Sequence, residues 1–97
     1  MCISLEIKYF AGKPSGQCWD TGDYSVQDRE RCHDASGKIE NVPDARLWGV
    51  TTNPHVPTGC YLETKFGGKR MYFNKHIDGH RNHEARPICE DNSTWLF

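Results

Sequence analysis

The sequence lacks the patterns that identify several large classes of protein. Its longest apolar stretch is far shorter than the roughly 20 residues that a membrane-spanning helix needs, so no transmembrane segment is expected. Residues 1–10 alternate polar and apolar side chains where a signal peptide would carry a continuous apolar segment. No Gly-x-Ser-x-Gly sequence and no phosphate-binding glycine loop is present. The absence of a Cys-x-x-Cys pair argues against a zinc ribbon or a thioredoxin-like redox site.

An excess of charge of one sign is also absent. Twelve Lys and Arg residues face thirteen Asp and Glu residues in a chain of 97, which gives a formal net charge of -1. Without a basic run the chain has no electrostatic footprint for nucleic acid, so we expect no nucleic-acid partner. The length predicts a single domain, residues 1–97, with a modest apolar core.

The chain does contain five cysteines, which are Cys2, Cys18, Cys32, Cys60 and Cys89. Their long spacings are typical of disulfides in a secreted or lumenal domain. Asn92 begins an Asn-Ser-Thr sequon for N-glycosylation, which belongs to the same compartment. We therefore predict a secreted, extracellular or organelle-lumenal protein in an oxidising environment. This favours Met1 as a start that follows a removed leader over Met1 as the native start.

Residue patterning predicts an α+β fold in which one short helix packs on a small antiparallel sheet stapled by disulfides. Alternating apolar and polar residues predict strands at residues 2–10, 46–52, 60–66 and 69–74. The helix is expected from about Val26 to Ala35, with Ser25 as its N-cap and Gly37 at its end. Its apolar stripe is thin, so contacts with the sheet or a disulfide must hold it.

The last two predicted strands are separated by Gly67-Gly68, and a pair of glycines between alternating runs is typical of a two-residue β-hairpin. This turn would place Phe66 opposite Lys69. One face of the hairpin would then form part of the core, with Cys60, Leu62, Phe66, Met71 and Phe73.

The cysteine-bearing segments of residues 15–90 follow a recognisable order. They are "SGQCWDTGDYSVQDRERCHDA", "VPTGCYL", "MYFNKHIDG" and "RPIC". This order resembles a small cysteine-rich module recurrent in predicted secreted proteins of marine microalgae and protists. The resemblance implies a compartment and an architecture but no reaction. It divides the domain into an N-terminal strand at 2–10, the module at 15–90 and a C-terminal tail at 91–97.

The four module cysteines allow three disulfide connectivities. Cys60 lies on the predicted core face of the hairpin and Cys32 on the apolar stripe of the predicted helix, so a Cys32–Cys60 disulfide would hold the helix in place. Cys18–Cys89 would then join the ends of the module. This pairing is favoured, although the sequence leaves the other two open. Cys2 is left over, either free or linked to another chain.

Residues 72–89 contain three of the five histidines and have several interpretations. In a metal-binding interpretation, His76, His80 and His83 would ligate zinc or another divalent metal, and Asp78 or Glu84 would add a fourth ligand. The favoured interpretation is structural and needs no cofactor. In it, Asn74 and His76 hydrogen-bond the loop backbone, Asp78-Gly79 turns the chain, and Cys89 anchors the return.

An enzymatic interpretation of the same segment comes from "HIDGHRNH", which resembles the core of HNH-type ββα-metal nucleases. There His76 would activate water, and His83 or Asn82 would hold the metal beside the scissile phosphate. Lys75 stands where that pattern usually has a His or Asp, and Pro87 interrupts the helix that should follow. We therefore keep the nuclease as an alternative.

The favoured function is a non-enzymatic binding or structural module that contacts a protein or glycan. Exposed aromatic side chains often mark such contact surfaces. The candidates by residue type are Trp19, Trp48, Tyr61, Tyr72, Trp95 and Phe97. A further alternative is a lumenal accessory subunit that docks on a large membrane complex through the apolar end of the 91–97 tail.

Overall fold

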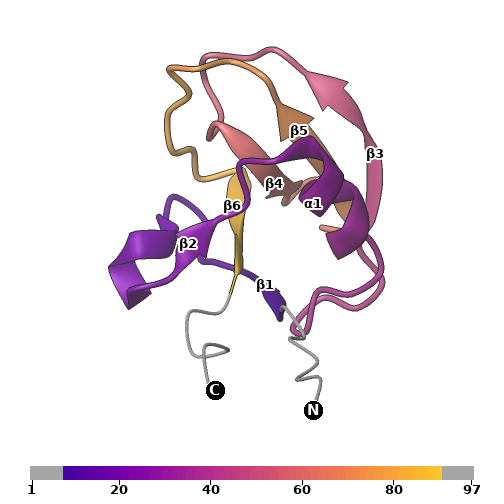
Figure 1. Cartoon of the computed structure of the whole chain (residues 1–97). Helices are drawn as coiled ribbons and strands as arrows, with labels where there is room; N and C mark the ends of the chain where they lie inside the picture. The colour runs from indigo at the N-terminus through magenta and orange to yellow at the C-terminus, as the bar shows by residue number, and fades with distance from the viewer. Residues whose placement is uncertain (1–7, 91–97) are drawn as a thin grey trace.

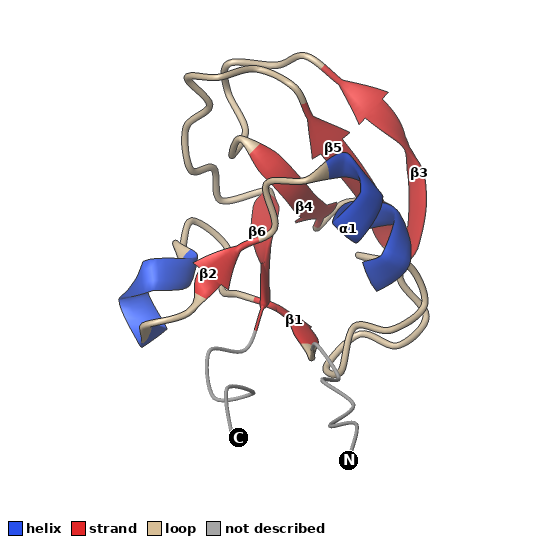
Figure 2. Cartoon of the chain, in the orientation of Figure 1, coloured by secondary structure: helices blue, strands red, loops and turns tan. Residues whose placement is uncertain are grey.

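The computed structural model describes residues 8–90, which form one mixed sheet with a short helix on it (Figure 1). The strands are β1 (Tyr9–Ala11), β2 (Tyr24–Ser25), β3 (Arg46–Thr51), β4 (Gly59–Glu63), β5 (Arg70–Asn74) and β6 (Ala85–Glu90). The helical segments are the 3-10 helix η1 (Cys18–Thr21) and the α-helix α1 (Arg29–Ala35). The helix α1 contacts β4 and β5, as Figure 2 shows. The predicted α+β class is confirmed.

The sheet has the strand order β1-β6-β4-β5-β3, and β2 pairs with β6 beside this path. β4 is antiparallel to both β5 and β6, as expected, whereas β3 runs parallel to β5. The loop after β3 leaves a gap in the sheet between β3 and β4. The later strand β5 fills this gap, antiparallel to β4 and therefore parallel to β3. The sheet is therefore mixed, although the sequence patterns suggested only antiparallel pairs.

The hairpin between β4 and β5 has a longer turn than predicted. Glu63 pairs with Arg70, and residues 64–69 form the turn. Phe66 has a φ of 54°, followed by two glycines that also have positive φ, and its side chain is 68% exposed. The predicted two-residue turn and the core position of Phe66 are therefore wrong. The other core residues of the hairpin keep their face because the register differs by an even number of residues.

The helix begins later than predicted. Its N-cap is Asp28, whose carboxylate accepts a hydrogen bond from the Glu30 amide at 3.0 Å. Ser25 lies in β2, so its predicted role as N-cap is wrong. Val26 continues the extended chain, because its amide donates to Ile88 O at 3.0 Å and its carbonyl accepts from Cys60 N at 2.8 Å. These two bonds hold Val26 between β6 and β4.

Two disulfides cross the core. Cys18 is joined to Cys89 with an S–S distance of 2.00 Å, and Cys32 to Cys60 with 2.10 Å. This is the pairing that the sequence analysis favoured. Each of these cysteines is at most 2% exposed. Cys32 and Cys60 belong to the buried cluster that also contains Tyr9, Val26, Ile39, Leu62, Met71 and Ile88. One disulfide ties η1 to β6, and the other ties α1 to β4.

The strand β6 was not predicted because Pro87 stands in its middle. Proline normally avoids sheet interiors, since it cannot donate a ladder hydrogen bond. Here the Pro87 carbonyl accepts from Gly12 N at 2.8 Å, just beyond the end of β1. Proline lacks the N–H that would bond Gly12 O in return, and Arg86 Nε donates to that oxygen instead, at 2.7 Å.

Several predictions concern residues outside the described range 8–90. These are Cys2, most of the N-terminal strand, the Asn92 sequon, and Trp95 and Phe97 in the tail. Within the described range, neither α1 nor η1 approaches the length and apolar character that would let a helix cross a membrane.

Candidate functional site

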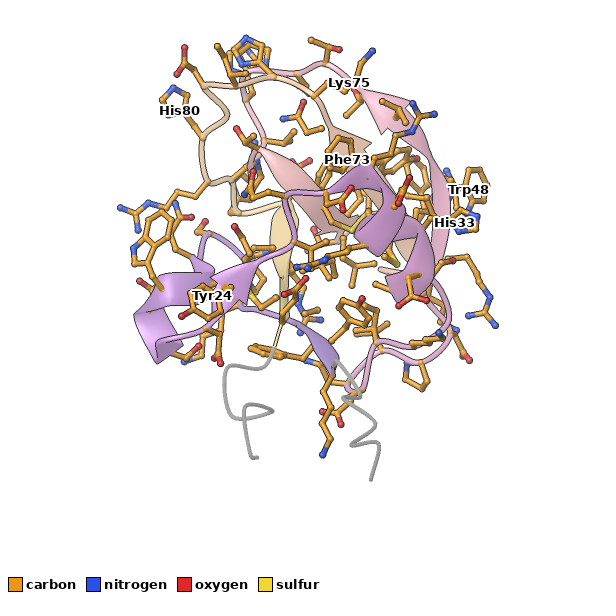
Figure 3. The ribbon with its side chains drawn as sticks, in the orientation of Figure 1. Tyr24, His33, Trp48, Phe73, Lys75 and His80 are labelled. Carbon is orange, nitrogen blue, oxygen red and sulfur yellow. A yellow bond between two sulfur atoms is a disulfide. The ribbon has the colours of Figure 1, made fainter. Side chains whose placement is uncertain are left out.

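An arginine lies against two exposed aromatic rings at the β3 margin of the sheet. The Arg70 guanidinium carbon is 3.9 Å from the ring centroid of Trp48 and 4.4 Å from that of Phe66. Both rings are well exposed, at 61% and 68%. Such cation–π contacts are worth about 0.5–1 kcal/mol each at exposed sites, so they favour the observed positions of the rings. Figure 3 shows Trp48 projecting from this margin.

A bulge in β3 explains how Trp48 reaches this position. Leu47 pairs with Met71 and Gly49 with Tyr72, so Trp48 is an extra residue without a partner in the parallel register. Bulges re-aim the side chain at the irregular position. Here the bulge places the Trp48 ring over Arg70, one register step from Met71. We call Trp48, Phe66, Arg70 and Tyr72 the aromatic strip.

Two tyrosines continue the strip toward the centre of the sheet. Tyr72 is half-buried in β5, and its ring stacks on Tyr61 of β4 with a centroid distance of 5.7 Å. Tyr61 itself is only 4% exposed, so its predicted role as an exposed contact residue is wrong. It occupies the central strand between β5 and β6, and burial raises its pKa to about 12. Tyr61 therefore packs beside Tyr72, on the same face of the sheet.

Trp19 lies away from this surface. It is 68% exposed, but it belongs to η1, which Figure 1 shows at the opposite side of the molecule from β3. The structure thus brings together Trp48, Tyr61 and Tyr72 among the predicted aromatic residues and leaves Trp19 apart. Phe66 and Arg70 complete the strip, although the sequence analysis did not select them as contact residues.

A second surface is formed by two loops, residues 52–58 and 75–84, that meet at one end of the molecule. We call these loops the tip. Asn74, at the end of β5, is fully buried and joins them. Its Oδ1 accepts from Asn53 N at 3.0 Å and His76 N at 3.1 Å. Its Nδ2 donates to the carbonyl oxygens of Asn53, Val56 and Pro57 at 2.8 to 3.1 Å.

Thr58 and Gly79 close the other side of the tip. The Thr58 hydroxyl donates to His76 O at 2.7 Å and accepts from Gly79 N at 2.8 Å. A Cβ on Gly79 would overlap the backbone of Val56 and Thr58, so only glycine lets the loops approach this closely. The expectation that Asn74 and His76 organise the loop backbone is met by these contacts.

The tip histidines do not gather around a common point. Within residues 8–90, no group of three His, Cys, Asp or Glu side chains is arranged to hold a metal ion, so His76, His80 and His83 form no predicted metal site. The segment after His76 continues as a loop into β6, where an HNH-type nuclease would require a helix. His76 Nδ1 accepts a hydrogen bond from Asp78 N at 3.1 Å.

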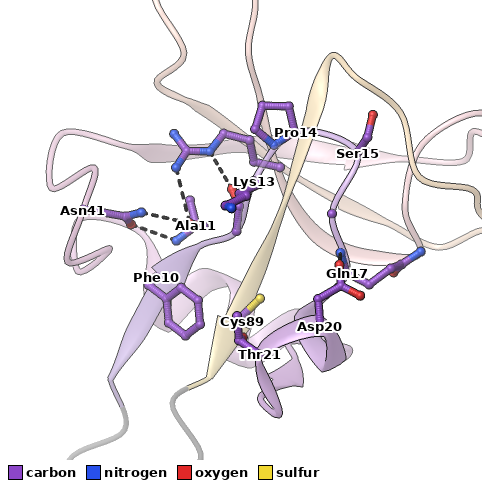
Figure 4. Close-up of a pocket in the computed structure, with 13 residues that line it drawn as sticks. Phe10, Ala11, Lys13, Pro14, Ser15, Gln17, Asp20, Thr21, Asn41 and Cys89 are labelled. Atoms are coloured by element: carbon purple, nitrogen blue, oxygen red, sulfur yellow. Dashed lines mark hydrogen bonds between the residues drawn. The ribbon is translucent and has the colours of Figure 1, made fainter.

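A cavity of about 520 Å³ lies between the turn after β1 and η1 (Figure 4). Two of its polar side chains, Asn41 and Arg86, form hydrogen bonds with the backbone. The Asn41 amide bonds both the amide and the carbonyl of Ala11 at 2.8 Å, and Arg86 Nε donates to Gly12 O at 2.7 Å. These contacts fasten β1 to its neighbours, which gives the polar lining a structural role.

Comparison of the chain with protein-family models, curated proteins and solved structures finds no match. The resemblance of residues 15–90 to the microalgal module therefore stays a prediction. The functional argument rests on the strip and the tip, because both expose large apolar side chains to solvent. Of the two, the strip has the greater area of exposed aromatic side chain.

Two signals in the sequence could have identified the strip. Trp48 and Arg70 lie in strands that were both predicted, and parallel pairing of those strands would have brought them together. Phe66 precedes two glycines, and a run of positive φ there turns its side chain outward. Both signals depend on strand direction and turn length, which local patterns leave undetermined.

Proposed function

We propose that this protein is a non-enzymatic, disulfide-stabilised binding module that contacts a protein partner through the aromatic strip. The observation that carries the proposal is the placement of Arg70 against the rings of Trp48 and Phe66. The domain leaves two large rings exposed to water, each in contact with the same guanidinium group. Exposed apolar surface of this kind marks contact sites in soluble proteins.

The composition of the strip favours a protein over a glycan. Trp, Tyr and Arg are the residues most enriched among the energetic centres of protein interfaces. Arg70 lies over both outer rings, so a sugar would have to share them with a guanidinium group. A carboxylate or carbonyl on a partner protein would instead complete the hydrogen bonding of Arg70 while apolar side chains cover the rings.

The two disulfides fit an oxidising compartment. We propose that the protein works in a secreted or lumenal setting, where both disulfides persist. A small binding module suits this setting because its disulfides add the stability that its small apolar core does not supply. The strip is then presented on a stiff scaffold, which lowers the conformational entropy lost on binding.

The test is affinity capture from a secretory-pathway extract of the source organism, with wild type, Trp48→Ala, Arg70→Ala and Trp19→Ala. Trp19 is the matched control because it is the other highly exposed tryptophan of the described residues. We expect a specific protein to be retained by wild type and Trp19→Ala and to lose roughly 30-fold or more in affinity with Trp48→Ala, the size of a hot-spot loss of about 2 kcal/mol.

A glycan microarray probed with the same four proteins covers the competing class of partner. Glycan binding that depends on Trp48 but not on Trp19 would replace the protein partner with a glycan. Equal retention of the captured protein by wild type and both strip variants would overturn the proposal altogether. Circular dichroism of each variant confirms that the fold is intact, since Trp48 and Trp19 are both surface residues.

A further inference from the structure

The strand β3 forms an open edge of the sheet beside the aromatic strip. It is the last strand in the order β1-β6-β4-β5-β3, and Figure 2 shows it at the margin of the molecule. Edge strands present backbone N–H and C=O groups without a neighbouring strand, and natural proteins usually protect them with bulges, prolines or charged side chains. The bulge at Trp48 protects only the first part of β3, because the register is regular from Gly49 to Thr51.

The backbone hydrogen bonds of β3 show which groups face outward. Thr51 O accepts from Lys75 N at 2.9 Å, so the backbone of Thr51 faces β5. Successive residues of a strand direct their N–H and C=O groups to alternate sides, so those of Val50 point to the open side. In the described part of the chain, no loop or side chain bonds these two groups. Leu47 N donates to Ser36 Oγ at 2.8 Å, which covers the other end of the edge.

Gly49 leaves open space beside this edge. Its φ lies outside the left-handed region, and a Cβ built there would meet nothing within 4 Å. Neither the backbone conformation nor crowding inside the domain therefore requires a glycine. A glycine inside a strand often marks a place where another chain approaches closely. Because Gly49 is the register partner of Tyr72 and follows Trp48, this open space lies next to the aromatic strip.

An excess of positive charge lies along the same edge. Arg46 and Arg70 are register partners, and neither forms an ion pair with a described residue. Lys75 follows at the end of the edge, where its amide bonds Thr51 O. Glu63 is opposite Arg70 in the β4–β5 register, without an ion pair between the two side chains. Like charges at paired positions repel each other, so carboxylates from a partner would stabilise this arrangement.

We propose that the protein partner adds an extended acidic segment as a strand to the open edge of β3. This inference rests on the proposed function and specifies how the aromatic strip is used. The backbone of the segment pairs with Val50, one of its side chains fills the space over Gly49, and a carboxylate binds Arg70. In strand addition the main-chain hydrogen bonds supply affinity and the side-chain contacts supply specificity.

Other occupants fit this edge less well. Pairing of β3 with β3 of a second copy would bring Arg46, Arg70 and Lys75 of both copies to one interface, where like charges repel. Lys69 and Asp44 pair with each other at 3.3 Å and do not offset this charge. A glycan lacks the regular row of N–H and C=O groups that a strand offers to an edge. An acidic peptide segment supplies both the backbone groups and the negative charge.

The first measurement is calorimetric titration of the full chain, with its disulfides intact. The probe is a synthetic peptide of about six alternating Glu and Val residues, acetylated and amidated at its ends. We expect saturable binding with a Kd below about 1 mM. The same peptide with an N-methyl group on each amide should bind roughly tenfold more weakly or worse, because it cannot donate backbone hydrogen bonds. A peptide with Gln in place of Glu should also lose roughly tenfold.

Amide hydrogen exchange of the same complex locates the contact. At saturating acidic peptide, exchange of the Val50 amide should slow roughly tenfold or more, because this amide gains a hydrogen bond. The Leu47 amide is the internal control on the same strand. It already donates to Ser36 Oγ, so its exchange should change less than about twofold.

Two variants test the side-chain contacts. Gly49→Leu fills the open space and should weaken binding of the acidic peptide roughly tenfold, while circular dichroism shows the fold unchanged. Arg70→Gln should reduce the preference for the Glu peptide over the Gln peptide from roughly tenfold to roughly threefold. The matched control is Arg81→Gln, which changes an exposed arginine in a cleft lined by Trp19 and is expected to bind as wild type.

The outcomes separate this inference from the proposed function. Peptide binding without protection of the Val50 amide would show that side chains alone hold the partner, and strand addition would be wrong. Absence of peptide binding, alongside capture of a protein that depends on Trp48, would overturn the acidic strand and leave the proposed function intact. Protection of Val50 without peptide, together with a dimer mass in light scattering, would replace the segment with a second copy.

Discussion

Replacing Asn74 should be the most damaging polar substitution in the described part of the chain. Its side chain is fully buried and makes five hydrogen bonds to the backbone of the two tip loops. Asn74→Ala removes all of them and leaves two amides and three carbonyls to find other partners. The loops are otherwise joined through Thr58, through His80 N to Val56 O and through Asn82 Nδ2 to His55 O. The Asn74 side chain makes more of these hydrogen bonds than any of the others.

The magnitude follows from the number of bonds. A hydrogen bond contributes about 0.5–1.5 kcal/mol net, and an unsatisfied buried group costs about 1–3 kcal/mol. Some of the freed backbone groups lie near the surface and will reach water. We therefore expect Asn74→Ala to lower the free energy of unfolding by about 4 kcal/mol, a large part of the 5–15 kcal/mol typical of a small domain.

Asn74→Asp tests the same geometry with an isosteric side chain. The introduced carboxylate would face the three carbonyl oxygens of Asn53, Val56 and Pro57, which now accept from Nδ2. Burial and these oxygens raise the folded-state pKa of the new carboxyl above its unfolded value. The variant should therefore be most stable below the unfolded pKa, and it should lose stability as the pH rises through the folded pKa.

Urea unfolding followed by tryptophan fluorescence measures both variants, with the disulfides intact. The matched control is Asn82→Ala, because Asn82 lies in the same loops but is partly exposed and makes two bonds, to His55 O and from Glu84 N. We expect the control to lose about 1 kcal/mol. A loss from Asn74→Ala no larger than that of the control would refute the view that Asn74 holds the tip together.

Three further predictions concern stability. Cys32→Ala/Cys60→Ala opens a loop of sequence separation 28 and should lower the free energy of unfolding by about 3.6 kcal/mol in the chain-entropy model; a loss below about 1.5 kcal/mol in urea titration would contradict that model here. Gly79→Ala should cost about 2–3 kcal/mol through backbone overlap, whereas Gly49→Ala, with open space around its Cβ, should stay within about 0.5 kcal/mol. The pKa of Tyr61 is raised to about 12, so the phenol loses its proton at a lower pH in the unfolded state than in the folded state. The free energy of unfolding should therefore fall as the pH rises from about 10 toward 12. Tyr61→Phe should reduce this alkaline loss, and an unchanged pH profile would contradict the raised pKa.

The α+β class, the hairpin faces and the placement of Cys32 and Cys60 follow from local alternation. Cys60, Leu62 and Met71 share a buried face because side-chain direction depends only on position along a strand. A register error of two residues leaves that face unchanged, which is why the faces are predictable although the turn is not. The core position predicted for Phe66 is wrong because local sequence does not distinguish a two-residue glycine turn from a longer turn that begins before the glycines.

The functional surfaces were harder to predict because each joins segments distant in the sequence. Arg70 meets Trp48 only because β3 runs parallel to β5. Asn74 and His76 could be placed at the start of a loop, but the loop that they bind, residues 52–58, follows a different strand. Local patterns therefore identify these residues without identifying their partners.

The two disulfides also impose an order on oxidation during synthesis. Cys18 and Cys89 are 71 residues apart, whereas Cys32 and Cys60 are 28 apart. Because synthesis starts at the N-terminus, Cys18 and Cys32 are both made before either native partner, Cys60 or Cys89. The native Cys32–Cys60 bond can close once β4 emerges, but Cys18 must wait for the last described strand. A bond formed between Cys18 and Cys32 before Cys60 and Cys89 are present would have to be exchanged by thiol–disulfide isomerisation to reach the native pairing.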